Sequence, residues 1–122
     1  MRNMMLVMAL LGLGLVPTGP AAAHAFLKAA VPAVGTTVTE GPHELRLRFS
    51  EGVEAAFSGV TLTTGDDQRV QPVTVAVDPA DSTILVVTLT APLAPGLYKV
   101  QWHVVSVDTH KTQGRYDFTV TP

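Results

Sequence analysis

The chain has 122 residues, 47% of them hydrophobic and 15% charged, with no cysteine and a formal net charge of -2. This length corresponds to one domain, and the lack of cysteine excludes disulfides, thiolate catalysis, iron-sulfur clusters and cysteine-based zinc sites. The nearly balanced charge, without a cluster of Lys and Arg, argues against a nucleic-acid surface, which needs basic side chains to neutralise phosphates.

The N-terminus has the pattern of an export signal. Arg2 provides a positive start, residues 4–16 are apolar residues and glycine, and a Pro-rich turn then leads to three alanines before His24. A positive start, an apolar stretch and small residues before the cut are typical of a secretory signal. The stretch is shorter than the about 20 residues that span a bilayer. We expect residues 1–23 to be removed by a cut after Ala23, leaving the exported domain 24–122.

The position of this cut decides which atoms the exported chain can offer to a metal. All four methionines lie in the first eight residues, so the domain that begins at His24 contains no sulfur. A cut after Ala25 is a less favourable alternative, because the bulky His24 would then stand in the middle of the small-residue motif.

The rest of the chain alternates apolar and polar residues, which predicts β-strands and no helix. The clearest strand places Tyr98, Val100, Trp102 and Val104 on one face and their polar neighbours on the other. The expected strands lie at residues 25–28, 44–49, 60–62, 73–77, 84–89, 98–104 and 116–120. About seven strands in one domain predict an all-β, antiparallel two-sheet sandwich of the immunoglobulin or cupredoxin type.

The four histidines differ in their context. His43 lies in a Gly-Pro-His turn, and we expect no role for it. His103 lies on the polar face of the strand around Trp102, where solvent exposure is the expected state. The other two histidines are better candidates for binding a metal.

A chain that begins at His24 presents two nitrogen atoms from one residue, the α-amine and the imidazole Nδ1, which can close a chelate ring. Asp108 and His110 are separated by one residue, which places both side chains on the same face of an extended chain, at the rim of the sandwich. Together these groups supply three nitrogens and one carboxylate oxygen. Cu(II) favours such a set, although Zn(II) can use the same ligands.

Three segments of the chain form a pattern that spans nearly the whole exported domain. The first is His24-Ala25-Phe26-Leu27 with Pro32-Ala33 and Gly35, and the second is Leu47-Arg48-Phe49-Ser50-Glu51. The third runs from Trp102 to His110 and continues with Gly114, Tyr116, Phe118 and Val120. Together they resemble the CopC family of copper-binding and copper-resistance proteins of the periplasm. The resemblance implies a periplasmic Greek-key sandwich that binds one Cu(II) per chain through His24, Asp108 and His110.

The same resemblance implies two further features. Glu51 would support the N-terminal ligand by hydrogen bonding, and a CopD-type transporter of the inner membrane would be a partner. Many members also carry a methionine-rich loop for Cu(I), and this chain has no methionine after Met8. We therefore expect a Cu(II) protein without a Cu(I) site.

Three functions compete. The first is a Cu(II) carrier or buffer that is not an enzyme and has no small-molecule substrate. The second is a copper monooxygenase resembling the lytic polysaccharide enzymes, although Asp108 would fill a position that oxygen chemistry needs open. The third is a metal-free immunoglobulin-like interaction module. A hydrolase triad of Ser106, Asp108 and His110 is not expected, because neighbours on one strand lack the geometry that joins base to nucleophile.

Overall fold

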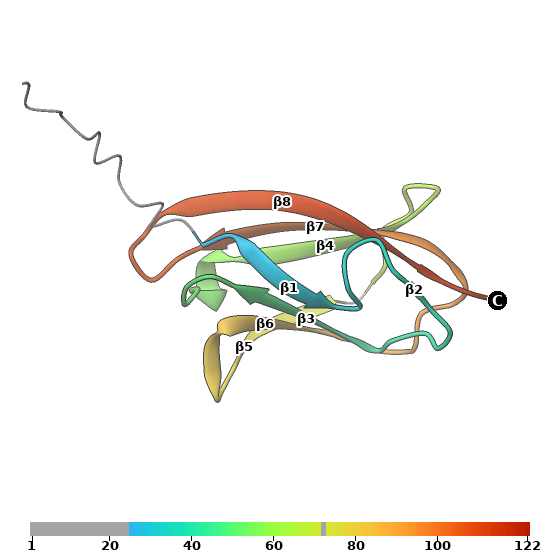
Figure 1. The fold of residues 1–122 in the computed structure, drawn as a ribbon, viewed down its shortest axis with the longest axis horizontal. Coiled ribbons are helices and arrows are strands. Elements are labelled where there is room, and N and C mark those ends of the chain that lie inside the picture. The colour runs from blue at the N-terminus through green and yellow to red at the C-terminus, as the bar shows by residue number, and fades with distance from the viewer. Residues whose placement is uncertain (1–24, 72) are drawn as a thin grey trace, which may run out of the picture.

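Two four-stranded sheets pack face to face in the computed structural model, which describes residues 25–71 and 73–122 (Figure 1). The strands are β1 (Leu27–Val31), β2 (Thr37–Val38), β3 (Glu44–Phe49), β4 (Gly59–Thr64), β5 (Val73–Asp78), β6 (Asp81–Leu89), β7 (Gly96–Val105) and β8 (Lys111–Val120). One sheet has the order β1-β3-β6-β5 and the other β2-β8-β7-β4. The expected all-β sandwich is confirmed.

The structure differs from the expected strands in small ways. The described residues form eight strands where about seven were expected, because the two-residue β2 is too short to produce an alternating pattern. β2 pairs parallel to β8, whereas every other pair is antiparallel. The first strand covers Leu27–Val31, not residues 25–28, and a short 3₁₀ turn, η1, occupies Ala55–Phe57.

The order of the strands is that of an immunoglobulin-type sandwich. β1, β3, β6 and β5 correspond to strands A, B, E and D, and β4, β7 and β8 correspond to C, F and G. The hydroxyl of Tyr98, near the start of β7, donates a hydrogen bond to the carbonyl of Ala94 at 2.6 Å. This is the tyrosine corner that fixes the entry to strand F in such folds.

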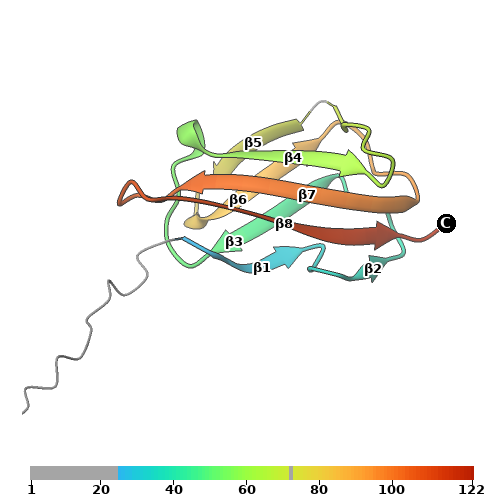
Figure 2. The same ribbon diagram turned by 90° about the horizontal axis from the view of Figure 1, so that it is seen from above.

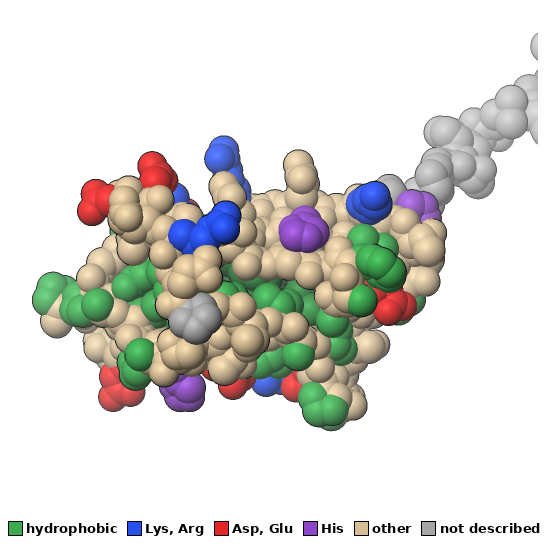
Figure 3. Space-filling model, turned by 180° about the vertical axis from the view of Figure 1, so that it is seen from behind, with side chains coloured by type: hydrophobic (Ala, Val, Ile, Leu, Met, Phe, Trp, Pro, Cys, Tyr) green, Lys and Arg blue, Asp and Glu red, His purple; other side chains and the backbone are tan. Residues whose placement is uncertain are grey.

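The core lies between the two sheets, and the alternation along β7 has the expected direction. Tyr98, Val100, Trp102 and Val104 are buried, whereas Gln101 and His103 are exposed. The Trp102 ring meets Phe49 edge to face, with centroids 5.0 Å apart. Seen from behind, apolar side chains form a band between the two layers and charged side chains lie above and below it (Figure 3).

The topology brings the start of the described chain to the tip of the β7–β8 hairpin. In Figures 1 and 2 the beginning of β1 lies at the same end of the sandwich as the turn that joins β7 to β8. β3 also ends there, because Leu27 of β1 pairs with Phe49. Three segments that are distant in the sequence therefore meet at this end.

The indole ring of Trp102 packs where a side chain at Gly114 would lie. A Cβ at position 114 would be 2.5 Å from Cζ2 of this ring. We expect Gly114→Ala to lower the free energy of unfolding by about 1–3 kcal/mol, the usual cost of overpacking a core. Thermal unfolding followed by circular dichroism measures this as a lower melting temperature.

Gly65→Ala is the matched control, because the nearest atom to its new Cβ would be Cβ of Leu97 at an ordinary 3.5 Å. Its melting temperature should stay close to that of the original protein. Equal stability of the two variants would contradict the packing of Trp102 on Gly114.

Candidate metal centre

The hairpin between β7 and β8 carries Asp108 and His110 on a tight turn. The amide of Ser106 bonds to the carbonyl of His110 at 2.9 Å, and the amide of Thr109 bonds to the carbonyl of Ser106 at 2.8 Å. Thr109 has a φ of 72°, the left-handed conformation that closes a three-residue hairpin loop. The chain therefore turns at Asp108 and is not extended there, contrary to the reasoning from residue spacing.

A second segment holds this hairpin in place from the side. The amide of Val107 bonds to the carbonyl of Gly52 at 3.0 Å, and the amide of Glu54 bonds to the carbonyl of Val105 at 2.8 Å. The turn is thus connected to the chain that follows β3, which restricts where Asp108 can lie.

The side chain of Ser106 holds the carboxylate of Asp108. It is the one polar residue that is buried in the described part of the chain, and its hydroxyl donates a hydrogen bond to Oδ1 of Asp108. This bond, with a smaller contribution from His110, holds the pKa of Asp108 below its usual range, although partial burial acts in the opposite direction. Asp108 is therefore ionised at neutral pH and ready to bind a cation.

The second oxygen of Asp108 faces His110. Nδ1 of His110 lies 3.1 Å from Oδ2 of Asp108, and 47% of the His110 side chain and 35% of the Asp108 side chain are exposed. Two ligand atoms about 2.0–2.2 Å from one metal ion and at right angles to each other are about 3 Å apart. The pair thus has the spacing of two adjacent ligands, at a surface that an ion can reach.

The first described residue lies beside this pair. Ala25 is fully buried, and its carbonyl accepts a hydrogen bond from the hydroxyl of Thr112, two residues after His110. Phe26 bonds to Ser50 in both directions, because its amide donates to the Ser50 hydroxyl at 3.0 Å and its carbonyl accepts from the Ser50 amide at 2.9 Å. The chain start is therefore fastened to both sheets next to the hairpin.

His24, the third predicted ligand, lies outside the described residues. Among residues 25–71 and 73–122, no group of three His, Cys, Asp or Glu side chains is close enough to hold a metal. Glu51 is half-buried in the bend after β3, one residue beyond Ser50, and among the described residues it has no hydrogen bond or ion pair. The structure thus brings together Asp108 and His110 of the predicted set.

The two histidines that were given no role lie apart from this pair. His43 precedes β3, at the opposite end of that strand, and its carbonyl accepts a hydrogen bond from the Leu89 amide at 2.8 Å. His103 lies on the outer face of β7 opposite Gly59 and is exposed, as expected.

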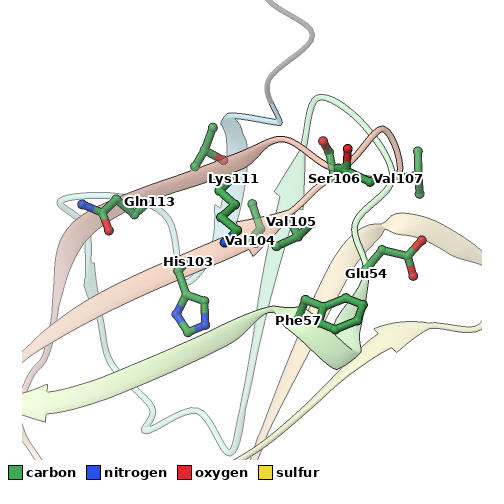
Figure 4. Close-up of a pocket in the computed structure, with 11 residues that line it drawn as sticks. Glu54, Phe57, His103, Val104, Val105, Ser106, Val107, Lys111 and Gln113 are labelled. Carbon is green, nitrogen blue, oxygen red and sulfur yellow. The ribbon is translucent and has the colours of Figure 1, made fainter.

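An open groove of about 870 Å³ lies next to the hairpin (Figure 4). Its apolar lining includes Phe57, Val105 and Val107, and Phe57 and Val107 are 67% and 58% exposed. Figure 4 shows His103 and Glu54 on either side of Phe57. Sequence reasoning missed this groove because two separate segments, η1 and the hairpin, form it.

Sequence reasoning also missed the hydroxyl groups of Ser106 and Thr112. The burial of Ser106 agrees with the alternation that continues from Trp102 and Val104, but that alternation gives no sign of its bond to Asp108. Nothing in the sequence indicates that Thr112 bonds to a residue 87 positions earlier.

The fold and this pair of side chains define an immunoglobulin-type sandwich with an exposed carboxylate-imidazole pair that can bind a metal ion. The CopC domain model matches residues 27–121, so the chain belongs to the CopC family. The expected family is confirmed. No helix among the described residues has the length and apolar character needed to cross a membrane.

Two curated relatives cover most of the chain. Protein YobA of Escherichia coli (strain K12) is 44% identical over 98 residues, which are 80% of this chain and 79% of that protein. Copper resistance protein C of Escherichia coli is 41% identical over 106 residues, which are 82% of this chain and 83% of that protein.

Two solved structures share the fold. CopC from Methylosinus trichosporium OB3b has a TM-score of 0.75 and 32% identity, with 81% of this chain and 95% of that chain covered. PcoC, a methionine-rich copper resistance protein from Escherichia coli, has a TM-score of 0.74 and 38% identity, with 81% of this chain and 100% of that chain covered.

Family membership decides between the competing functions. CopC proteins are copper-binding carriers and not enzymes, so the chain is a copper resistance protein of this class. The alternatives of a copper monooxygenase and a metal-free interaction module are therefore set aside.

The Ser106 hydroxyl lowers the pKa of Asp108, so its removal should raise it. We expect Ser106→Ala to move the titration of the Asp108 carboxyl to higher pH, because an ionised carboxylate loses a donor that favours its charged form. Carbon-13 NMR of the copper-free protein during an acid titration measures the midpoint.

Thr112→Val serves as the control, because Thr112 bonds to Ala25 and not to Asp108. An Asp108 midpoint that is the same in Ser106→Ala and the original protein would show that the serine does not hold the carboxylate.

Proposed function

We propose that this protein is a periplasmic carrier or buffer for Cu(II), which binds one ion per chain at the end of the sandwich where the chain starts. The ligands are the α-amine and imidazole of His24, the carboxylate of Asp108 and the imidazole of His110. The single observation that carries this proposal is the position of Ala25, which is bonded to Thr112 beside the Asp108-His110 pair.

Covalent geometry supports the participation of His24. Consecutive Cα atoms are about 3.8 Å apart, so the residue before Ala25 cannot be far from the hairpin. The proposal requires removal of residues 1–23, because only a free α-amine can bind a metal in this way. The signal pattern in the sequence supports that cut.

The ligand set supports Cu(II) over Cu(I). Residues 24–122 contain no methionine or cysteine, whereas Cu(I) favours thioether and thiolate sulfur. Imidazole, amine and carboxylate ligands suit Cu(II), which also binds such sites more strongly than other divalent ions of its row. We therefore propose no Cu(I) site in this chain, although the PcoC structure is described as methionine-rich.

Two further roles extend the proposal. Glu51 follows Ser50, which holds Phe26, so its carboxylate is at the correct end of the sandwich to support the N-terminal amine. A CopD-type transporter of the inner membrane is the proposed partner for copper transfer.

The N-terminal amine provides the sharpest test of the ligand set. One glycine added before His24 of the exported chain converts the amine to an amide. We expect Cu(II) affinity, measured by competition with a chelator, to fall severely. Loss of a group that only hydrogen-bonds to a metal ligand typically weakens binding about 10- to 100-fold, and loss of a ligand itself should exceed that range.

The affinity for Cu(II) should also fall as the pH is lowered, because the nitrogen ligands must release protons to bind the metal. The same competition measurement, repeated at several pH values, checks this.

His103→Ala is the matched control, since this imidazole lies on the exposed outer face of β7. Its Cu(II) affinity should equal that of the original protein. Unchanged affinity in the extended chain would remove the amine from the ligand set, and a large loss in His103→Ala would place the site elsewhere.

A further inference from the structure

The hydrogen bond between Thr112 and Ala25 is separate from the ladder between β7 and β8. Within that ladder the backbone of Thr112 pairs with Val104, and the hydroxyl is directed to a different segment. Thr112 is half-buried and belongs to β8, the strand that begins directly after His110. The bond therefore connects the start of the chain to the hairpin that carries two proposed ligands.

Ser50 completes the attachment from the other sheet. It follows β3 and bonds to both the amide and the carbonyl of Phe26. Ala25 lies between this contact and the Thr112 hydroxyl, and no part of it is exposed. The amide plane that joins Ala25 to Phe26 is thus fixed by partners from both layers of the sandwich.

Fixing Ala25 restricts the amine that precedes it. The peptide group between positions 24 and 25 is planar. Once the Ala25 carbonyl and Cα are held, only two rotations, about the N–Cα bond of Ala25 and the Cα–C bond of His24, set where the α-amine lies. Chain ends that lack such contacts are poorly ordered, and a disordered amine must lose that freedom when it binds a metal.

We propose that Thr112 is a positioning residue for copper binding, whose hydroxyl holds the chain start so that the His24 amine faces Asp108 and His110. This inference rests on the function proposed above. Thr112 does not touch the ion, and its contribution is to organise the site before copper arrives.

Three variants of the exported chain test the proposal. Thr112→Val removes the donor and keeps the shape of the side chain, whereas Thr112→Ser keeps the hydroxyl. Thr119→Val changes another half-buried threonine of β8, whose side chain has no hydrogen bond among the described residues. We expect Cu(II) affinity to fall about 10-fold in Thr112→Val, the scale for loss of an outer partner, and to remain near the original in the other two.

A second measurement separates positioning from general stability. Each Thr112 variant is also made in the chain with one glycine before His24, where the amine is already lost as a ligand. A positioning role predicts that Thr112→Val has little further effect on Cu(II) affinity in that chain, because the two changes act on the same group. An equal loss in both chains would mean that Thr112 only stabilises the fold, and would overturn the inference.

The remaining outcomes are also decisive. Original affinity in Thr112→Val, with a large loss in the extended chain, would reject the role of Thr112 and keep the proposed copper site. If the extended chain binds Cu(II) as well as the original, the proposed ligand set itself is wrong. Thr112→Ala replaces Thr112→Val in both chains if the valine does not fit beside Ala25, and the same comparison applies.

Discussion

The antiparallel pairing of β7 with β8 is the constraint on which the metal centre depends. The ladder runs from Gly96 opposite Val120 to Val105 opposite Lys111, and its inward side chains form much of the core. Because the strands are in this register, the turn between them projects Asp108 and His110 from the end of the sandwich. The same packing that stabilises the fold therefore sets the spacing of two proposed ligands.

The hydroxyl groups of two residues connect the sandwich to the proposed ligands. Ser106 is buried and bonds to Asp108, so one oxygen of the carboxylate is held while the other faces His110. Thr112 bonds to Ala25, which attaches the chain start to the same hairpin. The two bonds thus hold the hairpin and the chain start beside the proposed copper ligands.

The sequence predicts the sandwich well because its strands are half-buried, so that core-facing and solvent-facing residues alternate. It does not predict β2, which is too short to alternate, or the turn at Thr109, which depends on a left-handed backbone. Asp108 and His110 were correctly expected to lie together, but for the wrong local reason, since a turn and not an extended strand joins them. The Thr112 bond could not be predicted because its partner is distant in the sequence.

We propose that export creates the metal site by exposing the amine of His24. Intact-mass analysis of the exported protein, with and without Cu(II), measures both the cleavage position and the number of bound ions. We expect a chain of residues 24–122 that gains the mass of one copper ion. A chain that keeps residues 1–23 or begins at Phe26, or one that gains no copper, would contradict this proposal.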